Sequence, residues 1–387
     1  MKKKIVILGS TGSIGKTLIE IINNDKKSFE VLLLTANKDY LTLYKQAKKF
    51  NVKNLIITNL TSYKILTKKT KNTNINVYND FNCFNKFLKR KVDYTMSSIS
   101  GISGFEPTIK MIKHSKKIAI ANKESIICGW NLIKVELMKN KTEFVPVDSE
   151  HFSLWYGLQG LKEKNLEKIF ITASGGPFYK KPPKDFSKIR ISQALKHPNW
   201  KMGKKISIDS ATLINKVFEV IEAKNIFNID YKKIEILIHP NSYVHAILKF
   251  NNGLIKIIAH DTTMKIPIFN TISSNNIKKL NSQKINLQVL NNLNFKKVNP
   301  KTFPMIKLLN FLPNTQSMYE TVIVSANDKL VELFLENKIK FIDIQKKLFK
   351  LLLNKEFLKL KFKYPKKFQD IVDLNSYVRL KIDQNKL

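Results

Sequence analysis

Hydrophobic residues in the first part of the chain gather in short runs, and longer segments with helical periodicity separate these runs. Short apolar runs bounded by polar residues are typical of buried strands. The predicted strands are "KKIVIL" (3–8), "EVLLL" (30–34), "NLIIT" (54–58), "VDYTMS" (92–97), "KKIAIA" (116–121) and "EFVPV" (143–147). Helices are predicted between them, for example over 104–114 and 124–140. Alternation of this kind indicates an α/β fold with a doubly wound parallel sheet.

The pattern changes near residue 150. The elements predicted from there are a helix (150–160), a strand (166–173), a helix (210–227) and three strands (233–239, 242–250 and 253–260). A polar stretch then indicates a linker, and the remaining residues have a helical period. We therefore expect an N-terminal domain (1–149), a second α/β domain (150–269), a linker (270–300) and a C-terminal helical domain (301–387).

A glycine-rich turn, "GSTGSIG", follows the first predicted strand and opens the first helix. It contains Gly9, Gly12 and Gly15. Glycines at such a turn allow a pyrophosphate to approach the backbone amides of the helix N-terminus. The spacing differs from the strict G-x-G-x-x-G pattern, and a tight turn without a ligand would also need these glycines. The strand–turn–helix setting favours a Rossmann-type nucleotide site.

The tip of the second strand bears on the choice of nucleotide. NAD enzymes commonly place an acidic residue there for the ribose hydroxyls. This chain instead has Asn37 and Lys38. Because a lysine can pair with a 2'-phosphate, the sequence favours NADPH, although lysine is abundant throughout the chain.

Two acids follow the last strand of the first domain, in "VPVDSEHF" (145–152). Val145 and Val147 are expected to point into the core, so Asp148 and Glu150 emerge at the carboxyl end of the strand. Ligands bind at this edge of open α/β sheets. The two carboxylates suit a divalent cation or acid–base work, whereas the plainer interpretation is a cap for the next helix.

Further along the chain, polar residues indicate an anion site. Ser174 precedes two glycines after a strand, and His197, Trp200 and Gly203 lie in a loop with lysine-rich flanks. Ser210 is expected near the start of the helix 210–227, where a phosphate would be favoured. On that helix Asn215 and Glu219 share one face, beside Lys216. Each residue alone fits an ordinary cap or helix surface, but Asp148, Glu150 and Glu219 together supply hard oxygen ligands for Mg²⁺ or Mn²⁺.

Composition narrows the class of protein. The chain has 387 residues, of which 68 are basic and 30 acidic, giving a net charge of +38. Lysine is scattered, and no nucleic-acid-binding motif focuses the charge, so we expect no nucleic-acid partner. With only two cysteines, no signal-peptide pattern at the N-terminus and no apolar run of membrane-spanning length, we expect a cytoplasmic protein without a membrane partner.

These motifs together resemble 1-deoxy-D-xylulose 5-phosphate reductoisomerases. The similarity runs collinearly from residue 1 to about 268 and includes "ANKES", "SGGPF", "HPNWKMGKKISIDSATLINK" and "IHPNSYVHAIL". Over the tail it rests on "SANDKLVELFLENKIKFIDI". The resemblance implies a homodimer and a metal-dependent enzyme that rearranges a small phosphorylated sugar and reduces it with NADPH to 2-C-methyl-D-erythritol 4-phosphate. This is the committed step of the non-mevalonate isoprenoid route.

The resemblance also implies roles for individual residues. The expected NADPH-binding residues are Thr11, Gly12, Ser13, Ile14, Asn37, Lys38, Asn122, Glu124 and Gly203. The expected metal ligands are Asp148, Glu150 and Glu219, which with Lys123 form the catalytic set. The expected substrate-binding residues are Lys123, Ser149, Glu150, Ser174, His197, Trp200, Ser210, Asn215, Lys216 and Glu219, with Trp200 in a lid. His245 matches a family histidine, but a packed structural histidine fits it equally well.

The sequence departs from the family pattern at two places. Val217 stands where the family usually has glycine, and "HDTTMKIPI" (260–268) replaces a stretch that usually contains Gly, Pro-Asp and Arg. Two alternatives remain: another NADP-dependent oxidoreductase acting on a phosphorylated metabolite, and an inactive basic relative that binds nucleic acid. The first leaves the three acids unexplained, and the second requires the charge to lie on one face.

Overall fold

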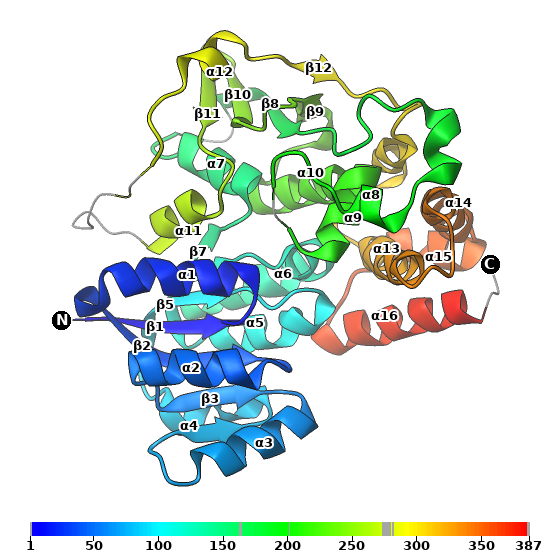
Figure 1. Cartoon of the computed structure of the whole chain (residues 1–387). Helices are drawn as coiled ribbons and strands as arrows, with labels where there is room; N and C mark the ends of the chain where they lie inside the picture. Colours follow the sequence, from blue (N-terminus) through cyan, green and yellow to red (C-terminus); the bar gives the residue numbers. More distant parts are fainter. Residues whose placement is uncertain (1, 162–164, 201, 273–279, 281, 385–387) are drawn as a thin grey trace. The chain divides into compact units, whose positions relative to one another are not determined.

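The computed structural model describes residues 2–161, 165–200, 202–272, 280 and 282–384. Contacts divide the chain into two units. The first contains residues 1–125, 132–148 and 264–280, and the second contains residues 126–131, 149–263 and 281–387. Figure 1 labels the helices and strands. Among the described residues, no helix combines the length and the apolarity needed to cross a bilayer.

The first unit is built on a seven-stranded sheet with the strand order β4-β3-β2-β1-β5-β6-β7. All of its neighbouring strands are parallel. The strands are β1 (Lys3–Leu8), β2 (Phe29–Ala36), β3 (Asn54–Ile57), β4 (Asn76–Tyr78), β5 (Val92–Ser97), β6 (Ser115–Ile120) and β7 (Glu143–Pro146). The helices that connect them are α1 (Ser13–Asn24), α2 (Tyr40–Phe50), α3 (Leu60–Thr70), α4 (Phe84–Phe87), α5 (Phe105–Ile112) and α6 (Lys123–Asn140).

Successive side chains of β1 enter different cores, which shows that the sheet is covered on both faces. Ile5 and Ile7 pack in one cluster with residues of α1, α2, α3 and α11 (Lys265–Ile272). Val6 and Leu8 pack in a second cluster with residues of α4 and α5. Because strand side chains alternate between faces, the two clusters lie on opposite sides of the sheet. The doubly wound parallel fold predicted from the sequence is therefore confirmed.

The second unit contains a mixed five-stranded sheet with the order β11-β10-β8-β9-β12. Its strands are β8 (Leu166–Ala173), β9 (Ile234–Ile238), β10 (Val244–Phe250), β11 (Ile255–Ala259) and β12 (Lys296–Lys297). β8 and β9 are parallel, and the other neighbours are antiparallel. α7 (Ser149–Gly157) and α10 (Ile214–Phe227) pack on this sheet through Leu154, Val220 and Ala223. The short helices α8 (Ile191–Ala194) and α12 (Leu287–Asn291) lie in its loops.

The C-terminal part of the second unit is helical, as predicted. Its helices are α13 (Tyr319–Leu335), α14 (Phe341–Leu352), α15 (Lys355–Leu358) and α16 (Phe368–Asp383). α13 is buried along most of its length. It is joined to α9 (Lys204–Thr212) by polar contacts: the Asn327 amide donates to the Asp209 carboxylate at 2.8 Å, and Lys205 lies 2.9 Å from both Asp209 and Asp328.

One predicted helix is wrong. The segment 210–227 forms the end of α9 and the whole of α10, because Leu213 between them has a left-handed backbone with φ 64°. A residue in this conformation ends a helix. Ser210 consequently lies near the C-terminal end of α9, and the expectation that it would lie at a helix N-terminus is corrected.

The contacts also group the chain differently from the predicted domain boundaries. The first boundary falls between residues 148 and 149, close to the predicted one. α11, however, packs in the core of the first unit through Ile268 and Ile272, although the prediction ended the second domain at residue 269. The predicted linker 270–300 includes α12 and β12. Its residues 273–279 and 281 lie outside the described residues.

Candidate active site

The glycine turn of the first unit is shaped by close backbone packing. Gly9 has φ +83°, and a Cβ there would lie 2.8 Å from the carbonyl oxygen of Ser98. A Cβ at Gly15 would lie 2.4 Å from the carbonyl oxygen of Gly9. Both positions therefore require glycine. The turn brings Thr11, Gly12, Ser13 and Ile14 to the N-terminus of α1, where Gly12 and Ser13 are exposed.

The other nucleotide-site residues predicted for this unit lie at the carboxyl ends of its strands. Asn37 and Lys38 follow β2 and are exposed, and the Asn37 amide donates to the Thr58 hydroxyl at 2.8 Å. Asn122 is buried after β6. Its amide group donates to the carbonyls of Ile99 and Gly101 and accepts from the Ser125 N–H, while Glu124 is buried on α6. The Asn122 side chain therefore shapes the loop beside the glycine turn.

Lys123 and Asp148 form an ion pair in the same unit. The Lys123 ammonium lies 3.1 Å from the Asp148 carboxylate, and both side chains are largely shielded from water. Val145 and Val147 are fully buried, as the sequence predicted. Asp148 ends the segment 132–148 of this unit, and its peptide bond leads to Ser149, the first residue of α7.

A buried lysine joins two acids in the second unit. The Lys216 ammonium contacts the Glu150 carboxylate and lies 2.5 Å from that of Glu219, while the Asn215 amide donates to the other Glu219 oxygen. The Ser149 hydroxyl donates to Glu150 at 2.6 Å. Burial alone would lower the pKa of Lys216, but the two carboxylates outweigh it and raise the pKa. The lysine is therefore charged at neutral pH.

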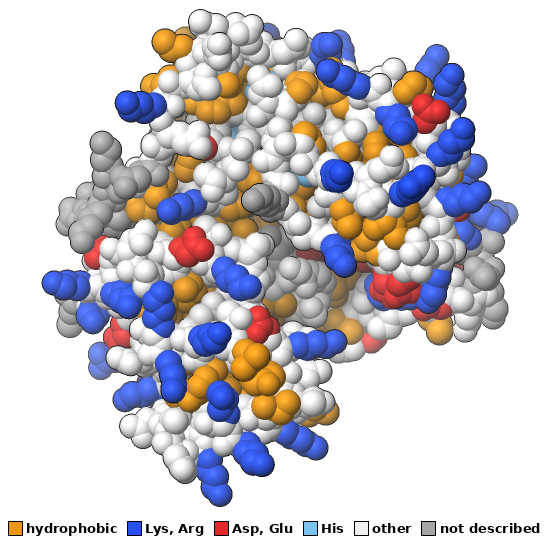
Figure 2. All heavy atoms as spheres, in the orientation of Figure 1, with side chains coloured by type: hydrophobic (Ala, Val, Ile, Leu, Met, Phe, Trp, Pro, Cys, Tyr) orange, Lys and Arg blue, Asp and Glu red, His pale blue; other side chains and the backbone are white. Residues whose placement is uncertain are grey.

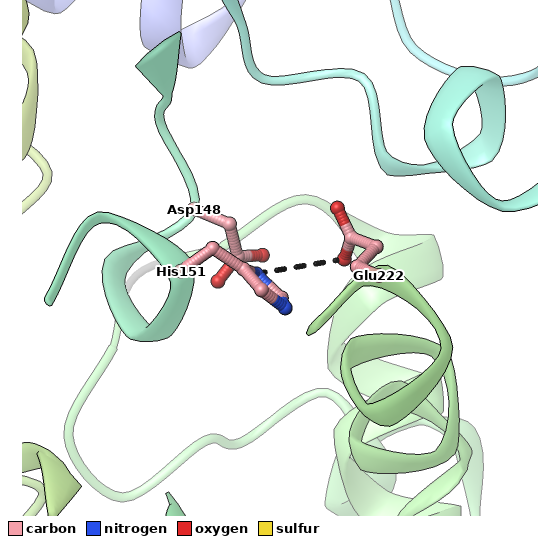
Figure 3. Close-up of side chains that lie close together, drawn as sticks. All are labelled: Asp148, His151 and Glu222. Atoms are coloured by element: carbon pink, nitrogen blue, oxygen red, sulfur yellow. Dashed lines mark ion pairs between the residues drawn. The ribbon is translucent and has the colours of Figure 1, made fainter. Parts of the chain in front are cut away.

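A second buried pair lies beside this cluster. His151 and Glu222 approach to 3.8 Å, and the His151 Nε2 is 2.8 Å from the Glu219 carbonyl oxygen. Figure 3 shows these two side chains facing each other, with Asp148 drawn on the segment that leads into α7. Neither residue was predicted from the sequence. Glu222 follows Glu219 by three positions on α10, so the spacing itself was an available signal.

His197 is held neutral by its hydrogen bonds. Its Nδ1 accepts from the backbone N–H groups of Asn199 (3.2 Å) and Trp200 (2.9 Å). Its Nε2 must then carry the proton, which it donates to the Ser174 hydroxyl at 2.9 Å. Burial and, next, the charge on Lys216 lower the pKa of His197 to about 4.

Ser174 is oriented by these contacts. Its oxygen also accepts from the Gly176 N–H at 3.0 Å. With both lone pairs engaged, its own hydrogen is available to an anion. Trp200 and Gly203 lie in the following loop, of which Lys201 is outside the described residues, and the exposed Gly203 precedes α9.

The second unit thus brings most of its predicted residues into two neighbouring groups: Glu150, Asn215, Lys216 and Glu219 in one, and Ser174, His197 and Trp200 in the other. The Lys216 charge acts on His197, which links the groups. Ser210 lies beside the second group through its backbone, since a Cβ at Gly176 would lie 2.9 Å from the Ser210 carbonyl oxygen. Basic side chains are scattered over the visible face of the molecule rather than gathered in one place (Figure 2).

These features define a class of protein. The glycine turn in a doubly wound sheet is typical of a nucleotide site, and buried carboxylates beside groups that can bind an anion indicate an enzyme that acts on an anionic substrate. Three family models match the chain: "1-deoxy-D-xylulose 5-phosphate reductoisomerase" at residues 5–129, its C-terminal domain at 144–227 and "DXP reductoisomerase C-terminal domain" at 261–381. The chain belongs to the 1-deoxy-D-xylulose 5-phosphate reductoisomerase family.

Full-length relatives support this assignment. A 1-deoxy-D-xylulose 5-phosphate reductoisomerase of Pelagibacter ubique is 59% identical over 382 residues, covering 98% of each chain. One from Clostridium tetani is 38% identical and covers 89% of this chain and 90% of the relative. Among solved structures, the enzyme from Zymomonas mobilis in complex with NADPH is similar with a TM-score of 0.89, 28% identity and 98% coverage of each chain. A DOX-P reductoisomerase in complex with NADPH, fosmidomycin and magnesium has a TM-score of 0.90 and 27% identity, covering 99% of this chain and 98% of that one.

The neutral state of His197 predicts a pH effect on stability. The ordinary pKa of histidine, near 6.5, applies to the unfolded chain, whereas the folded pKa is about 4. The unfolded state therefore binds the proton first, and the stabilisation present above the unfolded pKa is lost as the pH falls toward 4. The melting temperature of the wild type should fall more between about pH 7.5 and about pH 5 than that of His197→Gln. If the melting temperatures of the two proteins fall equally with pH, His197 is not held neutral.

Proposed function

We propose that Glu150 and Glu219, joined by Asp148, hold the divalent metal of this enzyme, and that Lys216, Asn215, Ser174 and His197 bind the phosphorylated substrate around it. The chain is an NADPH- and divalent-metal-dependent enzyme that rearranges 1-deoxy-D-xylulose 5-phosphate and reduces the product to 2-C-methyl-D-erythritol 4-phosphate. The convergence of Glu150 and Glu219 on one buried cation, the Lys216 ammonium, is the observation that carries the site assignment.

The residues present fit a metal of this kind. The two carboxylates are hard oxygen ligands, one of the Glu150 oxygens lies within 4.8 Å of one of Glu219, and they already surround a positive charge. Asp148 is separated from Glu150 by a single residue along the chain. When bound, Mg²⁺ or Mn²⁺ polarises the substrate carbonyl and stabilises enolate-like charge.

The remaining groups suit a phosphorylated sugar. The Ser174 hydroxyl offers a hydrogen to a phosphate oxygen, since its lone pairs are occupied by Gly176 and His197. Neutral His197 orients this serine without a proton transfer of its own. The Lys216 ammonium supplies positive charge in a water-poor site, where it acts on an anion more strongly than at the surface.

We propose that NADPH binds in the first unit along the glycine turn, with Thr11 to Ile14 beside the pyrophosphate and Asn37 and Lys38 beside the 2'-phosphate. The exposed N-terminus of α1 favours phosphate, and Lys38 is exposed after β2. Asn122 and Glu124 are also assigned to NADPH, because Asn122 holds the Ile99–Gly101 loop beside the glycine turn. Gly203 is assigned to the same cofactor from the Trp200 loop, which acts as the lid.

A homodimer is part of this proposal. The strand β11 is at one end of the sheet order. Its apolar side chains Ile255 and Ile257 are 58% and 49% exposed, and Leu254, which precedes the strand, is 65% exposed. An apolar edge strand is usually covered by another chain or element. We also propose a cytoplasmic location, which agrees with Cys83 and Cys128 being buried thiols.

The metal assignment predicts the effect of Glu219→Gln. The amide keeps the size of the side chain and an acceptor for Asn215 but removes the negative charge. Losing one hard ligand should lower kcat by at least about a hundred-fold, while NADPH affinity, measured by fluorescence titration, stays at the wild-type value. The matched control is Glu235→Gln, an acid of the same unit that pairs with Lys168 on the sheet surface. Near-wild-type turnover in Glu219→Gln would remove Glu219 from the metal site.

The dimer assignment predicts the effect of Ile257→Lys. A charge on the apolar edge strand should convert the wild-type dimer to a monomer in sedimentation velocity experiments. Leu60→Lys is the control, because Leu60 is 65% exposed on α3 of the first unit. The proposal is wrong if the wild type sediments as a monomer, or if Ile257→Lys still sediments as a dimer.

A further inference from the structure

His260 occupies one of the positions where this chain departs from the family pattern. It follows β11, and its side chain is buried, with 9% exposed. The backbone N–H of His260 donates to the Tyr243 carbonyl at 3.0 Å, which fixes the residue next to the start of β10. A large ring therefore lies near the sheet edge, in a stretch where the sequence of this chain differs from the usual family sequence.

The His260 ring stacks on His245. The ring centroids are 3.8 Å apart, and the planes are inclined by only 17°. The same two residues are also linked by a polar contact, because the His245 Nε2 lies 3.2 Å from the His260 carbonyl oxygen. One face of the His245 ring is thus covered by a second, nearly parallel ring.

The stack continues to the loop that carries Trp200. The Trp200 and His245 centroids are 6.1 Å apart at an angle of 71°, an edge-on arrangement that aromatic rings favour. Trp200 in turn donates its backbone N–H to His197, which orients Ser174. Three rings therefore connect the end of β11 to the proposed phosphate-binding group.

The contact of His260 with Asp261 fixes its tautomer. Its Nδ1 lies 2.8 Å from the Asp261 carbonyl and must donate to it, so the neutral ring keeps its lone pair on Nε2. Within the described part of the chain this buried Nε2 has no hydrogen-bond partner. Burial lowers the pKa of His260, although the Asp261 carbonyl and the charges of Glu150 and Asp261 act in the other direction. An uncharged ring can lie on His245 without repelling it.

We infer that His260 is a positioning residue for substrate binding: by stacking on His245 it holds the ring against which Trp200 packs, and so it fixes the Trp200 loop over the proposed substrate site. Without the ring, His245 loses the support of one face and Trp200 is no longer held edge-on. The effect on turnover rests on the proposed function, because the loop matters there only if it covers the substrate.

The test compares His260→Ala with His260→Phe, which restores a flat ring without nitrogen atoms. In His260→Ala we expect KM for 1-deoxy-D-xylulose 5-phosphate to rise about ten-fold, with kcat and KM for NADPH changed less than about three-fold. His260→Phe should return KM to near the wild-type value. The control is His114→Ala, which removes a buried histidine ring of the first unit that lies beside Phe84.

A second measurement does not depend on turnover. The emission of Trp200, obtained by subtracting the spectrum of a Trp200→Phe partner for each variant, should shift to longer wavelength in His260→Ala but not in His260→Phe. The inference is overturned if His260→Ala keeps the wild-type KM and the wild-type Trp200 emission. It is also overturned if His260→Phe shows the same changed KM and the same shifted emission as His260→Ala. If the emission shifts as expected while the wild type fails to turn over the substrate, the positioning role stands and the proposed function fails.

Discussion

The buried ammonium of Lys216 is the interaction on which the catalytic unit depends. Two carboxylates, one from α7 and one from α10, converge on it, so the charge joins the two helices that pack on the mixed sheet. Removing one partner of a buried ion pair commonly costs about 3–5 kcal/mol, because the other charge is left without compensation. The same arrangement concentrates negative oxygen atoms where a divalent cation can be held. Stability and the capacity to bind a metal thus come from one cluster.

The geometry of this cluster depends on the break between α9 and α10. The left-handed Leu213 ends α9 and sets the start of α10, so that Asn215, Lys216 and Glu219 lie together on its first turns. The C-terminal helices stabilise the other side of the break, since Asn327 and Asp328 of α13 contact Asp209 and Lys205 of α9. The helical C-terminal part therefore contributes to the active site although none of the proposed ligands lies in it.

The sequence predicted the features that depend on local pattern. The strands 3–8, 92–97 and 166–173 agree with the structure residue for residue, because short apolar runs with polar ends leave little choice of register. The Asn215–Glu219 contact also followed from helical spacing. The break at Leu213 was missed because leucine carries no signal for a left-handed backbone, which tertiary packing imposes here. The pairs His151–Glu222 and His245–His260 were missed because their partners come from different elements, and their approach depends on the packing of those elements.

The dependence of turnover on a metal tests the central claim most directly. The wild-type enzyme should be treated with a chelator, and NADPH oxidation in the presence of 1-deoxy-D-xylulose 5-phosphate should then be followed before and after addition of Mg²⁺ or Mn²⁺. We expect the chelated enzyme to bind NADPH without oxidising it, and the metal to restore turnover to 2-C-methyl-D-erythritol 4-phosphate. Undiminished turnover after chelation, or none with either metal, would contradict the account.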